Sequence, residues 1–295
     1  MPNYKTHSIH GEIVLSELND LKVPIYEEDM KSYCMGPDAM ILTDYKTFSM
    51  QHQSKTKDYF TYLLRLIKER HLQYNSEVMA FLYGQLAHFA LDVVTHPLIY
   101  YMTEDISCDT KFKAHGLVEN WIDDYMCRIY DRNDVNYYHK KSIESKELKK
   151  LIDDLYSKVY GTRKQSSKYS HGMSTIVMYD VLARRNKLGF IPFVIDKANV
   201  GDIMYSNDIR RVIPYLNLGN STWYNPETCE EYDDSFLDLW DKSIDVTLEL
   251  IDDVNNFLYK EKPLTSPLIL NNTSFNTGLP CEKGQTFQYV KRYNK

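Results

Sequence analysis

The sequence predicts an all-α fold, a single domain of many helices that spans residues 1–295. Apolar residues recur at the spacing of a helix along most of the chain. No strand pattern longer than a few residues and no internal repeat competes with this period. The chain is also long enough to bury a full hydrophobic core, and 43% of its residues are hydrophobic, which is ordinary for a globular protein.

Seven segments carry the helical period, and loops or turns separate them. The expected helices cover residues 10–21, 55–73, 78–95, 113–130, 145–160, 173–183 and 235–259. The stretches 161–170 and 217–232 read as loops, and residues 35–38 as a turn. From residue 263 onward, Pro, Asn, Thr and Gly accumulate and the period fades. We therefore expect residues 263–295 to form an irregular C-terminal tail that wraps the helical body.

The segment 78–95 differs from the other six because it is apolar nearly all round. Such a helix is buried on every side, so it should lie at the centre of the fold. His96 and Pro97 follow it, and the residue before a proline disfavours the α-helical backbone. We expect the central helix to end there.

The charge of the chain excludes one class of function. With a net charge of -6 and an isoelectric point of about 5.9, the protein is unlike those that bind an extended nucleic acid by neutralising many phosphates. Arg163, Lys164 and Lys168 form a local basic cluster, which we interpret as part of a solvated loop.

Cysteine usage and the N-terminus bear on where the protein acts. The five cysteines are an odd number without a CxxC spacing, which argues against a disulfide framework and a cysteine-based zinc site. The N-terminus has no apolar signal region. No run of consecutive apolar residues approaches the length of about 18 that a transmembrane helix needs. We expect a cytoplasmic protein with reduced thiols and no transmembrane segment.

The most informative residues lie along the central helix and at its end. His88, Asp92 and His96 are four residues apart, so their side chains share one helix face. Because this helix is otherwise apolar, that face should point into the interior. Burying a carboxylate beside two imidazoles costs on the order of several kcal/mol unless a metal ion or a tight hydrogen-bond network offsets it. The three residues together favour the metal site.

Further residues are weak signals when each is taken alone. His115 and Glu119 are again four residues apart on an expected helix, and imidazole nitrogen and carboxylate oxygen both suit zinc. An ordinary His–Glu ion pair on a helix surface has the same spacing. Asp38 lies in a Gly-Pro-Asp turn and His52 follows later in the chain, a spacing that means nothing by itself.

Taken in order, these residues resemble the ligand series of the bacterial zinc-dependent phospholipase C family. That family has a His near the N-terminus, then an Asp and a His on a loop, then HxxxD with a further His, then HxxxE. The matching residues here are His7, Asp38, His52, His88, Asp92, His96, His115 and Glu119. The Gly-Pro-Asp turn and the helix from Tyr83 to Asp92 are particularly similar, and the resemblance covers about residues 4–121.

The resemblance implies two or three zinc ions per chain. The first ion would be held by Asp38, His52, His88 and Asp92. The second would be held by His96, His115 and Glu119. A third would take His7, the other oxygen of Asp92 and the N-terminal amine. In the family that amine belongs to a Trp exposed by processing, whereas here it would belong to Pro2 after removal of Met1.

The resemblance also implies an activity. The family's Asp at the position of Asp38 is assigned as general base, which makes Asp38 the expected catalytic residue. The expected reaction is phosphodiester hydrolysis by a zinc-activated water, most simply phospholipase C-like cleavage of a phospholipid head group with peripheral contact to a membrane. Ala39 stands where phosphatidylcholine enzymes place an aromatic residue, so a small phosphodiester is an alternative substrate.

Two other readings stay open. Single-strand-specific zinc nucleases share this fold and ligand order, although they normally end in HxxxD where this chain has Glu119. A metal-stabilised structural protein without catalysis would keep the same ligands, because metal binding contributes folding energy. Of the other histidines, His10 is expected to be structural, and His71, His139 and His171 to lie at the surface.

Overall fold

Helices make up most of the protein. The computed structural model describes residues 4–103, 111–132, 142–185 and 212–284. Its α-helices are α1 (Tyr4–Glu17), α2 (Glu27–Tyr33), α3 (Tyr45–Gln53), α4 (Thr56–Glu69), α5 (Ser76–Thr103), α6 (Lys111–Ile129), α7 (Lys146–Tyr160), α8 (Gln165–Arg185), α10 (Phe236–Lys260) and α11 (Pro267–Leu270). Its 3₁₀ helices are η1 (Gly36–Met40), η2 (Leu72–Tyr74), η5 (Ile213–Tyr215) and η6 (Cys281–Lys283). In these ranges the only sheet pairs the two-residue strands β1 (Trp223–Tyr224) and β2 (Glu231–Tyr232) antiparallel. The all-α prediction is confirmed.

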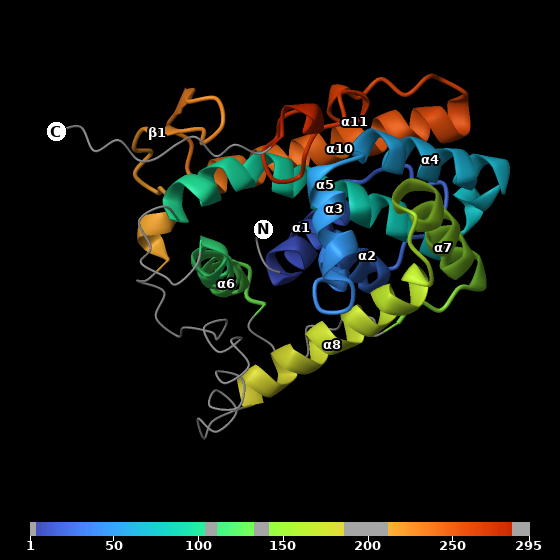
Figure 1. Cartoon of the computed structure of the whole chain (residues 1–295), viewed down its shortest axis with the longest axis horizontal. Coiled ribbons are helices and arrows are strands. Elements are labelled where there is room, and N and C mark those ends of the chain that lie inside the picture. Colours follow the sequence, from blue (N-terminus) through green and yellow to red (C-terminus); the bar gives the residue numbers. More distant parts are fainter. Residues whose placement is uncertain (1–3, 104–110, 133–141, 186–211, 285–295) are drawn as a thin grey trace.

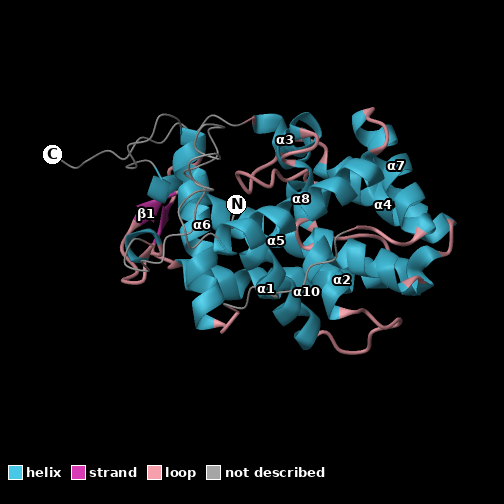
Figure 2. Ribbon diagram, turned by 90° about the horizontal axis from the view of Figure 1, so that it is seen from below, coloured by secondary structure: helices cyan, strands magenta, loops and turns pink. Residues whose placement is uncertain are grey.

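The long helix α5 is the centre of the fold. Helices α10, α2 and α1 pack along it, and α4, α7 and α6 surround them (Figure 1 and Figure 2). By length and composition α5 could cross a membrane, but 94% of its most apolar window is buried inside the protein. Its apolar surface therefore serves the core, as a helix that is hydrophobic all round should.

Helix α5 does not end at His96, so that prediction was wrong. The helix continues through Pro97 to Thr103. A proline at this position has no N–H to donate to the carbonyl of Val93, four residues earlier. Gly278 of the C-terminal segment packs against that carbonyl, since a Cβ atom on this glycine would lie 3.1 Å from the Val93 oxygen. The packing of Gly278 on the Val93 carbonyl thus accompanies a helix that continues through Pro97, against the tendency of proline to end a helix.

The first helix begins earlier than its hydrophobic pattern predicts. We expected a helix over 10–21, whereas α1 covers Tyr4–Glu17. Its first turn is capped by Asp123 of α6, whose carboxylate accepts hydrogen bonds from the backbone N–H groups of Lys5 and Thr6 at 3.2 and 2.9 Å. The Thr6 hydroxyl donates to the same carboxylate at 2.6 Å. This distant cap extends the helix to include His7.

Two of the other helices have the local caps that a sequence can reveal. Ser145 accepts a hydrogen bond from the backbone N–H of Leu148, and Gly161 ends α7 in the left-handed conformation at φ 70°. Ser235 and Asp238 form a reciprocal capping box at the start of α10. Such caps fix helix ends from neighbouring residues, which is why these two helices lie within a residue of their predicted bounds.

Helix α8 begins inside a stretch that we expected to be a loop. It starts at Gln165, and the helical prediction covered only 173–183. The side chain of Gln165 donates to the carboxylate of Asp44 at 2.7 Å, so the start of α8 is tied to the start of α3. The same Asp44 caps α3 by accepting from the backbone N–H of Thr47 at 3.2 Å. Neither α3 nor α2 had been expected, because both are short.

The C-terminal segment is irregular over the residues described, but it has a defined path. Between α10 and residue 284 it forms α11, η6 and an isolated bridge between Thr273 and Pro280. The carbonyl of Thr273 accepts a hydrogen bond from the Thr56 hydroxyl at 2.6 Å. The segment therefore lies against α4 and reaches the centre of the molecule. Residues 285–295 of the expected tail lie outside the described part.

Candidate metal centre

Helix α5 provides the three central side chains of the site. His88, Asp92 and His96 are all fully buried and follow one another along one face of the helix. The carboxylate of Asp92 lies between the two imidazoles, 3.1 Å from Nε2 of His88 and 3.9 Å from Nε2 of His96. The four-residue spacing thus places them together, as the sequence predicts.

Three other elements add one side chain each. His7 of α1 stacks its ring on His88, with centroids 4.0 Å apart, and its Nε2 lies 3.3 Å from Asp92. His52, near the end of α3, places Nε2 3.3 Å from the carboxylate of Asp38 in η1. Residues far apart in the sequence therefore meet around Asp92.

The Gly-Pro-Asp turn lies very close to α5. Gly36 has φ 53°, in the left-handed region that favours glycine. A Cβ atom at Gly36 would lie 2.3 Å from the ring of His88, so no side chain fits there. Glycine is needed both for the backbone conformation and for the contact, and it brings Asp38 over the imidazole.

Backbone carbonyls orient three of the imidazoles. The Nδ1 atoms of His52, His88 and His96 lie 2.8, 3.0 and 2.7 Å from the carbonyl oxygens of Phe48, Cys34 and Phe275. Because a carbonyl can only accept, Nδ1 carries the proton in each ring, and Nε2 of the neutral ring presents a lone pair. All three Nε2 atoms face the site, and none has a hydrogen-bond partner in the described part of the chain.

The two carboxylate oxygens of Asp92 face different sides of the site. Oδ2 lies 3.1 Å from Nε2 of His88 and 3.6 Å from Nε2 of His52. Oδ1 lies 3.3 Å from Nε2 of His7 and 3.9 Å from Nε2 of His96. This division suits a carboxylate that bridges two ions, and neither oxygen has a hydrogen-bond partner among the described residues.

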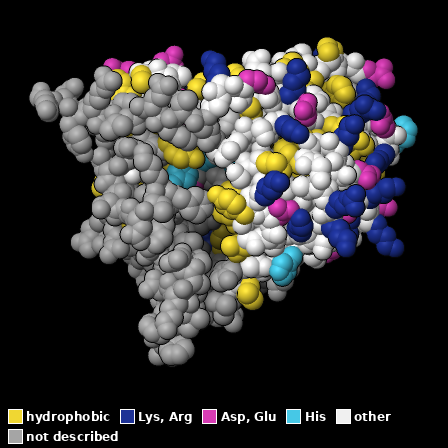
Figure 3. All heavy atoms as spheres, in the orientation of Figure 1, with side chains coloured by type: hydrophobic (Ala, Val, Ile, Leu, Met, Phe, Trp, Pro, Cys, Tyr) yellow, Lys and Arg dark blue, Asp and Glu magenta, His cyan; other side chains and the backbone are white. Residues whose placement is uncertain are grey.

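A second group lies at the more open end of the site. His115 and Glu119 of α6 are 2.7 Å apart, and their side chains keep 13% and 12% of their surface exposed. Together with His96 they offer three ligand atoms within 4.8 Å of one another. Tyr100 stacks on His115 with ring centroids 4.4 Å apart and forms one wall. In Figure 3 a histidine is visible in a hollow of this face, bordered by hydrophobic side chains.

Burial and neighbouring charges set the protonation of these groups. Burial, together with the charge of His88, lowers the pKa of His7 to about 4, and burial also lowers the pKa values of His96 and His115. For His88 the nearby carboxylates of Asp92 and Asp38 outweigh burial and raise the pKa. Burial alone would raise the pKa of Asp92, but the imidazoles of His88 and His96 hold it well below its usual range. At neutral pH the site therefore offers an ionised Asp92 and neutral imidazoles at His7, His96 and His115, the forms that bind a metal ion.

The eight residues named from the sequence fall into three groups, of which the first two share His88. Their ligand atoms lie within 4.8 Å of one another in the sets His7, His88 and Asp92; Asp38, His52 and His88; and His96, His115 and Glu119. This donor set of imidazoles and carboxylates fits zinc, with Asp92 between the first two groups. The N-terminal amine expected at a third ion belongs to residues outside the described part.

The remaining histidines lie elsewhere. His10 is fully buried and bonds Ser243 at 3.0 Å through Nε2, and burial lowers its pKa to about 3. His71 and His171 are exposed, and His139 lies outside the described residues. The four cysteines in the described residues (Cys34, Cys127, Cys229 and Cys281) are free thiols.

The sequence analysis missed two kinds of group that support the site. The carbonyls of Cys34, Phe48 and Phe275 belong to the backbone, so no side-chain pattern reveals them. Asp123 is four residues beyond Glu119 on α6, a spacing that could have been noticed, but its role is to cap α1. Burial raises the pKa of Asp123 to about 7.

Comparison with known proteins identifies a family for this chain. A family model described as zinc dependent phospholipase C matches residues 6–170, more than half of the chain, and the match contains all eight expected ligands. No curated protein matches the chain, and no solved structure does. On the extent of the family match, the chain belongs to the zinc-dependent phospholipase C family.

Proposed function

We propose that this protein is a zinc-dependent phosphodiester hydrolase that cleaves the head group from a phospholipid. Family membership supports the reaction class. The choice of a phospholipid follows the family's description, and Glu119 in the HxxxE position favours it over a nucleic acid. Phospholipids and nucleic acids both contain the phosphodiester bond that the enzyme would hydrolyse.

One observation carries the metal-dependent part of the proposal. Nε2 of His88 points a lone pair at the carboxylate of Asp92 from 3.1 Å, while its proton is used at Nδ1. Two lone pairs in a buried site repel each other unless a cation lies between them or a second proton is added. The same arrangement recurs at His52, His96 and Asp38, so one extra proton does not relieve it.

The donors divide between metal positions as follows. We assign Asp38, His52, His88 and Asp92 to one zinc. We assign His96, His115 and Glu119 to a second zinc. His7 and Oδ1 of Asp92 are the protein's contribution to a third, with the N-terminal amine as its remaining candidate ligand. Bound zinc would supply Lewis acidity, which polarises the phosphate and lowers the pKa of water.

The side chains of the protein have distinct tasks in this proposal. Asp38 keeps 10% of its side chain exposed, whereas Asp92 is fully buried. We therefore assign to Asp38 the removal of a proton from the attacking water, and to Asp92 the fixing of the imidazoles. His115 and Glu119 are at the open end, so the phosphate would enter past them. Tyr100 holds the ring of His115 in place by stacking.

Hydrolysis assays test this proposal. The zinc-loaded protein is offered p-nitrophenylphosphorylcholine, phospholipid vesicles and single-stranded DNA, each with and without a chelator. We expect chelator-sensitive release of the phosphorylated head group from vesicles, and a His88→Ala variant should show none. Hydrolysis of DNA alone would replace this proposal with a nuclease. Zinc binding without chelator-sensitive hydrolysis of any of the three would indicate a metal-stabilised structural protein.

A further inference from the structure

Three large hydrophobic side chains are exposed just after η1, at the start of α3 and on α8. Leu42, Tyr45 and Met178 expose 53%, 56% and 52% of their surface. Leu42 follows η1, which carries Asp38, and Tyr45 is the first residue of α3, which carries His52. The ring of Tyr45 lies 5.5 Å from that of Phe48, which lies 4.5 Å from the ring of His52. Leu42 and Tyr45 thus belong to the same short stretch of chain as Asp38 and His52.

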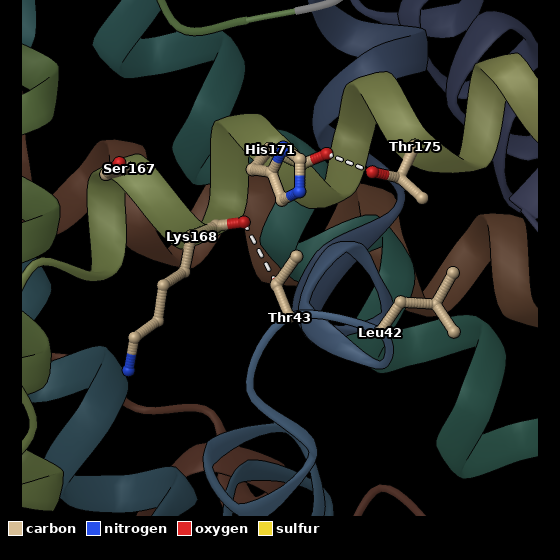
Figure 4. Close-up of a pocket in the computed structure, with 6 residues that line it drawn as sticks. All are labelled: Leu42, Thr43, Ser167, Lys168, His171 and Thr175. Carbon is tan, nitrogen blue, oxygen red and sulfur yellow. Dashed lines mark hydrogen bonds between the residues drawn. The ribbon is translucent and has the colours of Figure 1, made fainter.

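Helix α8 completes this apolar surface. Its residues His171, Thr175 and Met178 are four and three residues apart, so they share one helix face. His171 and Thr175, together with Leu42, line an open groove of about 420 Å³ between α8 and the end of η1 (Figure 4). Thr43 donates a hydrogen bond to the carbonyl of Lys168 at 3.0 Å, which fixes the two walls of the groove relative to each other.

Exposed cations border the same surface. Arg163 and Lys164 are exposed immediately before α8, and Lys46 is exposed beside Tyr45. The contacts of Asp44 with Gln165 and Lys168 join the start of α8 to the start of α3, so these cations lie close to Tyr45. The basic cluster, interpreted from sequence as part of a solvated loop, is thus attached to an apolar surface beside the site.

This part of the protein is basic although the whole chain is acidic. Residues 145–171 contain seven Lys or Arg and three Asp or Glu, while the net charge of the chain is -6. Two of those acids already have partners: Asp153 accepts from the backbone N–H of Ser166 at 2.9 Å, and Asp154 pairs with Arg70 at 2.6 Å. In Figure 3 hydrophobic side chains lie between the hollow with its histidine and the region where Lys and Arg gather.

We propose that this surface, the docking face, binds an anionic phospholipid bilayer. We define the docking face as Leu42, Tyr45, Lys46, Arg163, Lys164, His171 and Met178. The inference rests on the proposed function for its choice of phospholipid, and it adds that the substrate is taken from a negatively charged surface. Apolar side chains ringed by cations are the pattern by which peripheral proteins attach to such membranes. Asp38 lies only four residues before Leu42, so docking brings the side of the metal centre that carries Asp38 towards the lipid head groups.

Vesicle sedimentation with the full-length zinc-loaded protein tests this inference. Vesicles are made of phosphatidylcholine alone, or of phosphatidylcholine and phosphatidylglycerol in equal parts. We expect binding to the mixed vesicles that weakens in high salt. Replacing three cations together (Lys46→Gln, Arg163→Gln and Lys164→Gln) should weaken it about 100-fold, since each basic residue near an anionic membrane contributes about fivefold. Leu42→Ser should weaken it about tenfold through lost burial.

Matched variants on the other side of the molecule serve as controls. Lys242, Lys260 and Lys262 are exposed on α10 and just beyond it, and α5 lies between α3 and α10 in Figure 2. Replacing these three lysines with Gln removes the same charge and should leave binding unchanged. Leu218→Ser removes an exposed leucine from another region and should also have no effect.

A soluble substrate separates this inference from the proposed function. Hydrolysis of p-nitrophenylphosphorylcholine should be the same in the docking-face variants and in the unaltered protein. Vesicle binding by a protein without hydrolytic activity would uphold the docking face and reject the enzyme. The inference is overturned if the unaltered protein ignores mixed vesicles. It is also overturned if the charge variant binds like its control, or if single-stranded DNA is bound in place of vesicles.

Discussion

Asp92 lies at the middle of the candidate metal centre. It is fully buried, and four imidazole Nε2 atoms lie between 3.1 and 3.9 Å from its two oxygens. In a medium of low dielectric constant such a carboxylate stays ionised only when positive charge lies close to it. Two or more zinc ions would supply that charge and would use every lone pair now pointed inward.

Asp38 differs from Asp92 because its side chain keeps 10% of its surface exposed, and its proposed role as base can be tested by substitution. Asp38→Asn keeps an oxygen ligand of the same shape but removes the proton acceptor. We expect zinc content to be retained and kcat to fall by roughly 10²- to 10⁴-fold. Elemental analysis and steady-state hydrolysis of p-nitrophenylphosphorylcholine measure the two quantities.

Asp44→Asn is the matched control for that substitution. Asp44 is six residues further along, and its carboxylate binds Gln165 and Lys168 outside the metal centre. It should cost some stability and leave kcat within a few-fold of the unaltered protein. Full activity in Asp38→Asn would remove the assignment of Asp38 as base, and loss of zinc from it would make Asp38 mainly a ligand.

At the scale of residues, the sequence predicted the candidate ligand side chains but not the backbone groups that orient them. His88, Asp92 and His96 could be placed on one face because helical spacing is a local property. His7, Asp38 and His52 came from the family resemblance, since no local rule brings α1, η1 and α3 together. The hydrogen bond from His96 to the carbonyl of Phe275 joins residues 179 positions apart and leaves no trace in side-chain identity.

At the scale of elements, α1 depends on a cap that comes from another helix. Asp123 of α6 holds the first turn of α1, and the same α6 carries His115 and Glu119. The cap therefore couples the position of His7 to the second group of ligands. Sequence analysis placed α1 six residues too late because its start signal lies more than a hundred residues away.

Removing this cap should loosen both the helix and the metal. Asp123→Ala leaves the N–H groups of Lys5 and Thr6 without their acceptor, which should cost about 1–2 kcal/mol of stability. We expect the zinc nearest His7 to be lost first in a chelator titration. Urea unfolding and zinc content measured on the same samples check both statements.

Ser145→Ala provides the comparison for the cap. Ser145 caps α7 through the N–H of Leu148, in an element that contributes no ligand. Its loss should destabilise the protein by a similar amount and leave zinc retention as it was. Equal zinc loss in the two variants would mean that general destabilisation, and not the placement of His7, releases the metal.

The C-terminal segment behaves as a structural wall of the site. Its Phe275 both accepts from His96 and donates its N–H to the carbonyl of His52 at 3.0 Å. Gly278 has φ 69° and packs on the carbonyl of Val93 that Pro97 leaves without a donor. A composition rich in Pro, Asn and Gly predicted irregularity correctly, but irregular chain can be held as firmly as a helix when backbone groups are paired.

A substitution at Gly278 tests whether that wall matters. Gly278→Ala should cost about 1–2 kcal/mol for the left-handed backbone, and more for the close contact with Val93. It should also weaken zinc binding, because the segment that orients His96 is displaced. Gly161→Ala has the same backbone strain at φ 70° with open space around its Cβ. Gly161→Ala should therefore lose stability without losing zinc, and identical behaviour of the two variants would contradict the role given to the segment.

At the scale of the whole molecule, the proposed ligands come from elements that are distant in sequence. They come from α1, η1, α3, α5 and α6, and the C-terminal segment orients one of them. The helical class and the central position of α5 could be predicted, since both follow from apolar periodicity. The arrangement around α5 could not, because it depends on contacts between residues such as Asp44 and Gln165 that are distant in sequence.

Because the proposed zinc ions would join so many elements, their removal should destabilise the entire protein. A ligand that binds only the folded state adds about 4 kcal/mol when its free concentration is 1,000 times its dissociation constant. For a chain of this size that corresponds to a fall in Tm of roughly 10 °C when zinc is chelated. Calorimetry with chelator, and then with excess zinc, measures the fall and its reversal. Magnesium should not restore the Tm, since it prefers oxygen ligands and this site offers five imidazoles with three carboxylates. An unchanged Tm after complete zinc removal would show that the buried imidazoles and carboxylates are satisfied without a metal, and the catalytic proposal would fail with them.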